Sequence, residues 1–267
     1  MFLPRKFADY LERLLPSAVS RALHRLYDPY LNWQVGRLNQ RVLRKLFPDG
    51  KLVVLGGPFA GTKYLPLTWN TVLIPKLTGT YEQELHPAVE QFLKRDYRAI
   101  INIGCSEGYY LIGAGLRIPK AFLHGFDLHQ PGLELCKKLA ELNGVTPRLT
   151  LHEGCTVDAL VPLVGAGTLV ICDCEGGEIE FLDPVRVPGL RQADLLVELH
   201  DRVAPGVTTT IQKRFSPTHR IKLFASSRFD PDRCPALAGL NEHERRFAIE
   251  EFRDGPMNWV SMEAFGS

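Results

Sequence analysis

The sequence lacks an apolar run approaching the roughly 20 residues that a membrane-spanning helix needs. Its first residues, MFLPRKFADYLERLL, also lack the apolar core of a secretory signal, because charges interrupt them every few positions. Cysteine is sparse: there are six in 267 residues, no CxxC pair, and a CxC at 172–174 without a second half at zinc-site spacing. A disulfide scaffold is therefore excluded, and we expect reduced thiols in a cytoplasmic protein.

Net charge is also nearly absent, since 32 Lys and Arg against 30 Asp and Glu leave +2. No overall basic field of the kind that nucleic-acid binders carry is present, so we expect no nucleic-acid partner. Residues 1–50 are the exception, because they hold 9 basic and 4 acidic side chains, a net of +5. Apolar residues recur there at helical spacing, namely Phe7, Tyr10, Leu11, Leu14, Leu15, Leu31, Val35, Leu38, Val42 and Leu46. We expect a basic helical extension that caps the main domain, or that touches an anionic membrane surface or a protein partner.

From residue 99 onward, apolar strands alternate with amphipathic helices. The expected strands cover 99–104, 121–128, 147–154, 167–176, 193–201, 220–227 and 258–265. This alternation predicts one α/β domain over 99–267, with a seven-stranded, mostly parallel sheet and helices on both faces. Residues 51–98 are punctuated by Gly, Pro and Thr and predict a loop-rich lead-in segment, with one helix over 86–95.

The ends of the first two expected strands carry a binding pattern. In an open parallel sheet, ligands bind beyond the carboxyl ends of the strands. The first strand runs into Gly104-Cys105-Ser106-Glu107-Gly108, where two glycines permit close backbone approach and a helix start offers free N–H groups. The second strand ends at Asp127, 19 residues after Gly108, where a carboxylate can accept hydrogen bonds from both hydroxyls of a ribose. Together they predict a nucleoside-containing cofactor.

Acidic residues and a histidine follow the fourth and fifth expected strands. Asp173, Glu175 and Glu178 follow the fourth, and His200 and Asp201 end the fifth. Clustered carboxylates are costly without a function, although Glu178 could simply complement the dipole of the next helix. His200 is the first candidate for a general base, since an ordinary pKa of about 6.5 suits proton abstraction near neutrality. Asp201 could orient His200 or act as the base itself, and Asp173, Glu175 and Asp201 are an alternative set of oxygen ligands for Mg²⁺.

Four runs now carry a family resemblance. INIGCSEGYY, GFDLHQPGLELCKKLAELNGV, VICDCEGGEIEFL and LLVELHD resemble class I S-adenosylmethionine-dependent methyltransferases, and more narrowly the FkbM-type family. The resemblance covers residues 78–203, and its most specific part is D-x-E-G-x-E at 173–178. It implies a Rossmann-like methyltransferase domain that transfers a methyl group to oxygen on a small-molecule, sugar or lipid-linked acceptor, with nitrogen as the alternative acceptor.

The resemblance also implies which residues hold the cofactor. Upstream of the first strand, GTYEQEL (79–85) resembles a short element that lies beside S-adenosylmethionine in such enzymes. The implied binding residues are Tyr81, Glu82, Gly104, Cys105, Ser106, Gly108, Tyr109, Asp127, Leu128, Gly154, Cys155 and Asp173. This sequence departs from the family pattern at Asn102, where Asp is usual, and at Cys155, where an acidic residue often reaches the adenine.

Other classes of function fit some of the same residues. Gly104–Gly108 matches G-x-S-x-G, and Ser106, Asp173 and His200 follow the order of an α/β-hydrolase triad. That fold places several strands before its nucleophile, whereas only 51–57 is a plausible strand here. A nicotinamide-dependent reductase would have glycine where Ser106 stands. A non-catalytic nucleoside-binding module would retain the fold without a reason for the acidic cluster.

Overall fold

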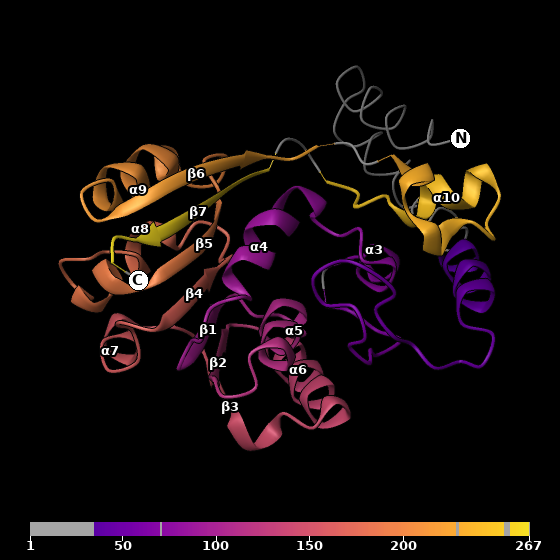
Figure 1. Ribbon diagram of the computed structural model, residues 1–267, viewed down its shortest axis with the longest axis horizontal. Coiled ribbons are helices and arrows are strands. Elements are labelled where there is room, and N and C mark those ends of the chain that lie inside the picture. Colours follow the sequence, from indigo (N-terminus) through magenta and orange to yellow (C-terminus); the bar gives the residue numbers. More distant parts are fainter. Residues whose placement is uncertain (1–34, 70, 228–229, 254–256, 267) are drawn as a thin grey trace, which may run out of the picture. The chain divides into compact units, whose positions relative to one another are not determined.

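The computed structural model describes residues 35–69, 71–227, 230–253 and 257–266 (Figure 1). The chain divides at Gly50 into two compact units, Met1–Gly50 and Lys51–Ser267. In the first unit, residues 35–46 are helical, as their spacing predicts. The earlier apolar positions Phe7, Tyr10, Leu11, Leu14, Leu15 and Leu31 lie outside the described residues. None of the helices within the described ranges is long and apolar enough to cross a membrane.

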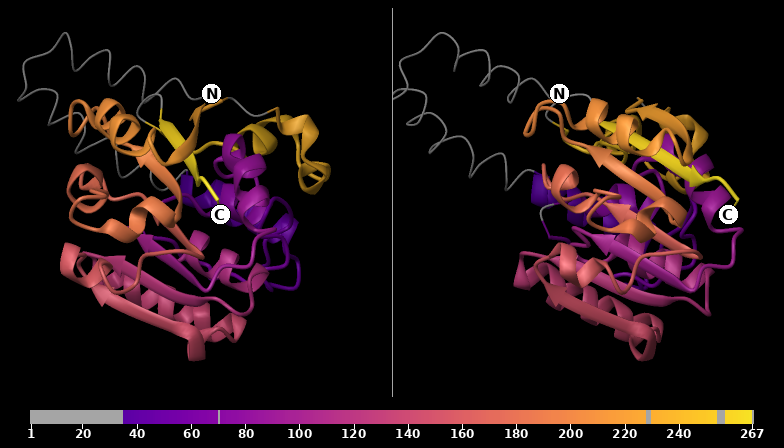
Figure 2. Two further views of the ribbon diagram at one scale, coloured as in Figure 1. Left: turned by 60° about the vertical axis from the view of Figure 1, so that its left-hand side comes forward. Right: turned by 90° about the vertical axis from the view of Figure 1, so that its left-hand side faces the viewer.

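A seven-stranded sheet organises the second unit (Figures 1 and 2). Its strands are β1 (Ala99–Ile103), β2 (Phe122–Asp127), β3 (Leu149–Glu153), β4 (Thr168–Cys172), β5 (Asp194–Leu199), β6 (His219–Ala225) and β7 (Asn258–Ala264). They lie in the order β3-β2-β1-β4-β5-β7-β6. Strands β1 to β5 are parallel, and β7 runs antiparallel to both of its neighbours. The predicted seven-stranded, mostly parallel sheet is confirmed.

Helices cover both faces of this sheet, as the alternating pattern predicts. The α-helices of the unit are α3 (Leu73–Thr78), α4 (His86–Phe92), α5 (Tyr109–Arg117), α6 (Gln130–Asn143), α7 (Val157–Leu160), α8 (Glu178–Phe181), α9 (Val207–Phe215) and α10 (Glu242–Ala248). Short 3₁₀ turns cover Gln83–Leu85, Thr146–Arg148, Pro188–Gln192, Pro231–Arg233 and Pro235–Leu237. Figure 1 shows α4, α5 and α6 on one face and α7, α8 and α9 on the other. The central strands β1, β4 and β5 are buried along their whole length, which explains their mostly apolar sequences.

Two elements differ from the sequence-based expectation. The stretch 51–57 forms no strand of the sheet, and its Val53 makes a single antiparallel bridge with Lys63. The run EHERRFAIEEF (242–252) predicts a helix over its whole length, whereas α10 ends at Ala248. Tertiary contacts account for the early end, because the carboxylate of Glu251 accepts a hydrogen bond from a backbone N–H of the lead-in segment.

A buried carboxylate joins the amino-terminal edges of the central strands. Asp194, at the start of β5, accepts hydrogen bonds from Nη1 of Arg95 and from the hydroxyl of Tyr97, both at 2.6 Å. Its other oxygen accepts the backbone N–H of Ala264 at the end of β7, at 3.0 Å. One side chain therefore links the segment before β1 to β5 and β7, at the edge of the sheet opposite the carboxyl ends of the parallel strands.

We expect Asp194→Asn to lower the free energy of unfolding by about 2 kcal/mol, because hydrogen bonds to a charged group contribute about 1.5–3 kcal/mol. Urea unfolding would measure the loss. The matched control is Asp232→Asn, which weakens the exposed ion pair with Arg245 and should cost less than about 1 kcal/mol. Equal losses in the two variants would contradict the role given to Asp194.

Candidate functional site

The turn after β1 brings the ends of β1 and β4 into direct backbone contact. Gly104 has φ +78°, and a Cβ there would lie 1.6 Å from the carbonyl oxygen of Asp173. The backbone N–H groups of Gly104 and Cys105 both donate to the carbonyl oxygen of Phe126, at 2.8 and 3.0 Å. Gly108 begins α5 with φ +91°, and a Cβ there would lie 2.6 Å from Sγ of Cys136. Glycine is therefore required at both ends of the turn.

Asp127 holds this turn from the end of β2. Its Oδ2 accepts the backbone N–H of Ser106 at 2.7 Å, and its Oδ1 accepts the backbone N–H of His129 at 2.8 Å. Its carbonyl oxygen accepts the N–H of Gly154, the residue after β3, at 2.7 Å. The ends of β1, β2 and β3 are thus joined through one residue that the sequence predicts as a ligand of the ribose.

An apolar surface adjoins Asp127. Leu128 is 77% exposed although its side chain is large and apolar. A Cβ at Gly154 would lie 3.6 Å from Cδ2 of Leu128, and Cys155 beside it is half-buried. An exposed leucine over a glycine offers a flat, apolar contact of the kind that a purine ring can cover.

Beneath the turn lies a buried ion pair that the sequence analysis missed. Glu107 forms a salt bridge with Lys76, and its carboxylate also accepts hydrogen bonds from the hydroxyls of Tyr64 at 2.9 Å, Thr71 at 3.2 Å and Ser106 at 2.9 Å. Burial alone would raise the pKa of Glu107, but the charge and hydrogen bond of Lys76 outweigh it and lower this pKa. A glutamate inside a glycine turn was a visible signal, whereas its partner 31 residues upstream was not.

Aromatic rings of the lead-in segment surround the start of α5. The ring of Tyr109 meets those of Phe59, Tyr64 and Tyr81 edge-on, with centroids 5.2, 6.3 and 5.4 Å apart. Nζ of Lys76 lies 4.9 Å from the ring centroid of Tyr81. Tyr109 is buried in this cluster, so its side chain packs the turn, while Tyr81 connects the turn to the residues that follow it.

Glu82, next along the chain, is buried and points inward. The hydroxyl of Tyr110 donates to Glu82, and Nη2 of Arg253 lies 3.7 Å from it. The backbone N–H of Glu82 donates to Oε1 of Glu251 at 3.0 Å. Burial raises the pKa of Glu82 well above its ordinary value, against the lowering effect of Arg253. Tyr110 and Arg253, which are distant from each other in the sequence, therefore enclose this carboxylate.

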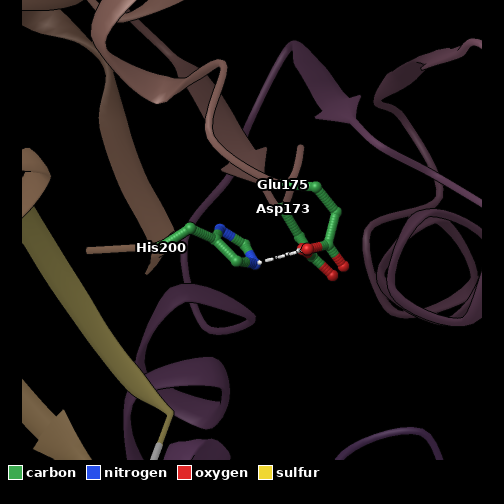
Figure 3. Close-up of side chains that lie close together, drawn as sticks. All are labelled: Asp173, Glu175 and His200. Atoms are coloured by element: carbon green, nitrogen blue, oxygen red, sulfur yellow. Dashed lines mark ion pairs between the residues drawn. The ribbon is translucent and has the colours of Figure 1, made fainter. Parts of the chain in front are cut away.

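His200 lies among four carboxylates at the ends of β4 and β5. Figure 3 shows it beside Asp173 and Glu175. Its Nδ1 donates to Oε1 of the buried Glu178 at 2.6 Å. Its Nε2 lies 3.6 Å from Oδ1 of Asp173, 3.5 Å from Oε2 of Glu175 and 3.7 Å from Oε2 of Glu198. Within the described residues, this buried Nε2 has no hydrogen-bond partner. Nε2 of the imidazole therefore faces Asp173 and Glu175 without a hydrogen bond to either.

Asp201 does not join this group. Its carboxylate accepts the backbone N–H of Gly206 at 3.2 Å and the N–H of Thr208 at 3.3 Å, as well as the hydroxyl of Thr208. It thus caps the start of α9, while Glu178 takes the place at His200 that the sequence analysis gave to Asp201. Successive residues at the end of a strand point to opposite sides, which explains why His200 and Asp201 separate.

Ser106 is also placed away from the histidine. Its hydroxyl donates to the carbonyl oxygen of Trp69 at 3.0 Å and to Oε2 of Glu107 at 2.9 Å. The hydrolase alternative needs Ser106 hydrogen-bonded to His200, but the hydroxyl of Ser106 contacts Trp69 and Glu107 instead.

The electrostatics of the cluster follow from burial. Burial raises the pKa of Glu198 far above its ordinary value, and the nearby Asp173 and Glu82 raise it further. Burial also raises the pKa of Asp173. For His200, burial lowers the pKa, but the hydrogen bond to Glu178 and the charge of Asp173 give a net increase. The site is therefore rich in groups that hold or attract protons and other cations.

We expect Glu198→Gln to stabilise the protein increasingly as pH rises from about 5 to about 8. In the unfolded chain Glu198 loses its proton near pH 4.3, whereas in the folded chain its raised pKa keeps the proton on. Rising pH therefore favours the unfolded wild type, and glutamine removes this effect. Thermal unfolding in EDTA across that range measures it. The exposed Glu141→Gln is the control and should show no trend; an advantage that shrinks with pH would contradict the assignment.

Gly104→Ala should prevent β1 and β4 from meeting at the turn. The matched control is Gly206→Ala, which has a similar φ of +90° but no atom within 4 Å of the new Cβ. We expect the control to lose about 1–2 kcal/mol for the left-handed backbone alone. Gly104→Ala should lose clearly more, measured by urea unfolding, because a carbonyl oxygen occupies the space. Similar losses of unfolding free energy in the two variants would show that the close contact between Gly104 and Asp173 does not contribute to stability.

Comparisons with known proteins were made by sequence and by structure. No protein-family model and no curated protein matches the sequence. Among solved structures, the human methyltransferase 10 domain containing protein is 12% identical over 86% of this chain and 98% of that chain, with a TM-score of 0.48. Precorrin-6y C5,15-methyltransferase from Geobacter metallireducens GS-15 is 12% identical over 63% and 82%, with a TM-score of 0.42. The METTL16 MTase domain is 12% identical over 74% and 71%, with a TM-score of 0.44.

Proposed function

We propose that the protein is an S-adenosylmethionine-dependent methyltransferase of the FkbM type. One observation carries the proposal: the glycine turn of β1, tied to Asp127 of β2, lies directly against Asp173 of β4. This is the switch point of the sheet. From β1 the chain first adds β2 and β3 on one side, and then crosses to add β4 and β5 on the other. A nucleoside site and an acidic reaction site therefore share one strand edge.

The cofactor would lie along this edge, from β3 toward β4. Asp127, which accepts two N–H groups at the turn, would also accept hydrogen bonds from the ribose hydroxyls. Leu128 and the backbone near Gly154 and Cys155 would contact the adenine. The methionine end would lie toward Asp173, near Tyr81 and Glu82, so residues 51–98 complete the site that residues 99–267 build.

The acidic cluster suits a positively charged methyl donor. Bound S-adenosylmethionine supplies an electrophilic methyl group on a cationic sulfur. The protein must hold the acceptor in line with that methyl group and exclude water, so geometry contributes much of the rate. Asp173 and the Glu178–His200 pair lie where the acceptor would be held.

The acceptor is expected to be oxygen on a small molecule, a sugar or a lipid-linked compound. A hydroxyl becomes a better nucleophile when a base takes its proton or when a cation lowers its pKa. Unprotonated Nε2 of His200 could take this proton, or it could bind such a cation. An amine is the alternative acceptor.

The basic segment 1–50 would contact a protein partner or an anionic membrane surface.

Calorimetric titration with S-adenosylmethionine and S-adenosylhomocysteine tests the proposal. We expect the wild type to bind both and Asp127→Asn to bind at least about tenfold more weakly, because a charge-assisted hydrogen bond contributes about 1.5–3 kcal/mol. Glu153→Gln is the matched control, since Glu153 pairs with Asp127 across the strands but is exposed. The absence of binding to both compounds would overturn the proposed function.

A further inference from the structure

We propose that Asp173, Glu175 and His200 bind a divalent transition-metal ion such as Mn²⁺ or Zn²⁺. One ligand atom from each residue lies within 4.8 Å of the others. The binding site stands on these residues alone. The role that we give the ion, to hold an oxygen of the methyl acceptor, rests on the proposed function.

The spacing of the ligand atoms fits a shared ion better than a hydrogen bond. Nε2 of His200 lies 3.6 Å from Oδ1 of Asp173 and 3.5 Å from Oε2 of Glu175. A proton on Nε2 would need an oxygen within about 3.2 Å to make a good N–H···O bond. Two atoms that each lie about 2.1 Å from a tetrahedral ion are separated by about 3.4 Å. The observed distances therefore match two ligands on either side of a cation.

The burial and hydrogen bonding of the imidazole, apart from the distances, also fit a metal ligand. It is 6% exposed, and its Nε2 is buried without a hydrogen-bond partner among the described residues. Its Nδ1 donates to Oε1 of Glu178, itself completely buried, at 2.6 Å. Metal-binding histidines commonly donate their second N–H to a carboxylate, which fixes the tautomer with the lone pair facing the ion. Glu178 is then a positioning residue, and Oε2 of Glu198 lies 3.7 Å from Nε2.

The site is closed on one side and open on the other. His200 is buried, Asp173 is 35% exposed and Glu175 is 79% exposed. Three protein ligands with an open side are typical of catalytic metal sites, whereas structural sites have a complete set. The open positions would face the acceptor, so the acceptor would present a hydroxyl or another oxygen ligand there.

The donor set also indicates which ion fits. The sequence analysis gave Asp173, Glu175 and Asp201 to Mg²⁺, which prefers oxygen ligands and retains several waters. The structure replaces Asp201 by an imidazole nitrogen. Imidazole suits Zn²⁺ and carboxylates suit Mn²⁺, so a mixed set favours a first-row transition ion over Mg²⁺.

The test uses the full chain, freed of affinity tags, treated with EDTA and titrated with Mn²⁺ under electron paramagnetic resonance. We expect one tightly held Mn²⁺ per chain, and pulsed measurements should show coupling to one imidazole nitrogen. This readout needs no substitution and therefore does not depend on whether a variant folds. Failure to hold Mn²⁺, or a bound Mn²⁺ without nitrogen coupling, would overturn the proposal.

Variants then locate the ion. His200→Gln and Asp173→Asn should lower Mn²⁺ affinity by at least about tenfold, and Glu178→Gln by about 10- to 100-fold, as expected for a residue that orients a ligand. Asp201→Asn and the exposed His243→Gln are matched controls that should retain it. Equal loss in the controls would contradict the assignment.

Parallel titration with S-adenosylhomocysteine separates the two proposals. A protein that binds S-adenosylhomocysteine but not Mn²⁺ overturns the metal site and leaves the methyltransferase proposal standing. A protein that binds Mn²⁺ at these residues but neither adenosyl compound overturns the proposed function, while the metal site itself is supported.

Discussion

The close contact between Gly104 and the carbonyl oxygen of Asp173 is the constraint on which the site depends. Because no side chain fits at Gly104, the turn after β1 and the turn after β4 share one small volume. The same turn is held from the other side by Asp127, through the N–H of Ser106. The residues proposed to bind the cofactor lie next to the acidic residues because backbone packs on backbone there.

Burying carboxylates is unfavourable unless each has a partner, and the fold supplies these partners from distant parts of the chain. Lys76 compensates Glu107 beneath the turn, and Arg253 with the hydroxyl of Tyr110 compensates Glu82. At His200 compensation is incomplete, since a single imidazole faces several acids. A cationic methyl donor or a metal ion would supply the positive charge that balances these acids.

Local pattern predicted most of the fold, because the seven strands are apolar runs bounded by turn residues, and all seven were expected near their observed positions. It also predicted the glycine turn after β1 and placed Asp127 at the end of β2, because both follow from the local sequence. It could not find Lys76 or Arg253, whose partners are distant in sequence. It also assigned Asp201 to His200, because the direction of a side chain after a strand depends on the backbone of the following turn.

Backbone conformation points to the same region. In the described part of the chain, the non-glycine residues with positive φ are Glu82, Ser106, Glu175 and Phe252. Such a conformation costs roughly 1–2 kcal/mol for a residue with a side chain. The first three belong to the proposed cofactor and metal sites, and Phe252 adjoins Glu251 and Arg253, which hold Glu82. Glu175 is the clearest case. Its side chain is 79% exposed, so burial of the side chain cannot offset the unfavourable backbone conformation. Its conformation instead directs the carboxylate toward His200, so local stability is given up where the geometry of the acidic cluster is set.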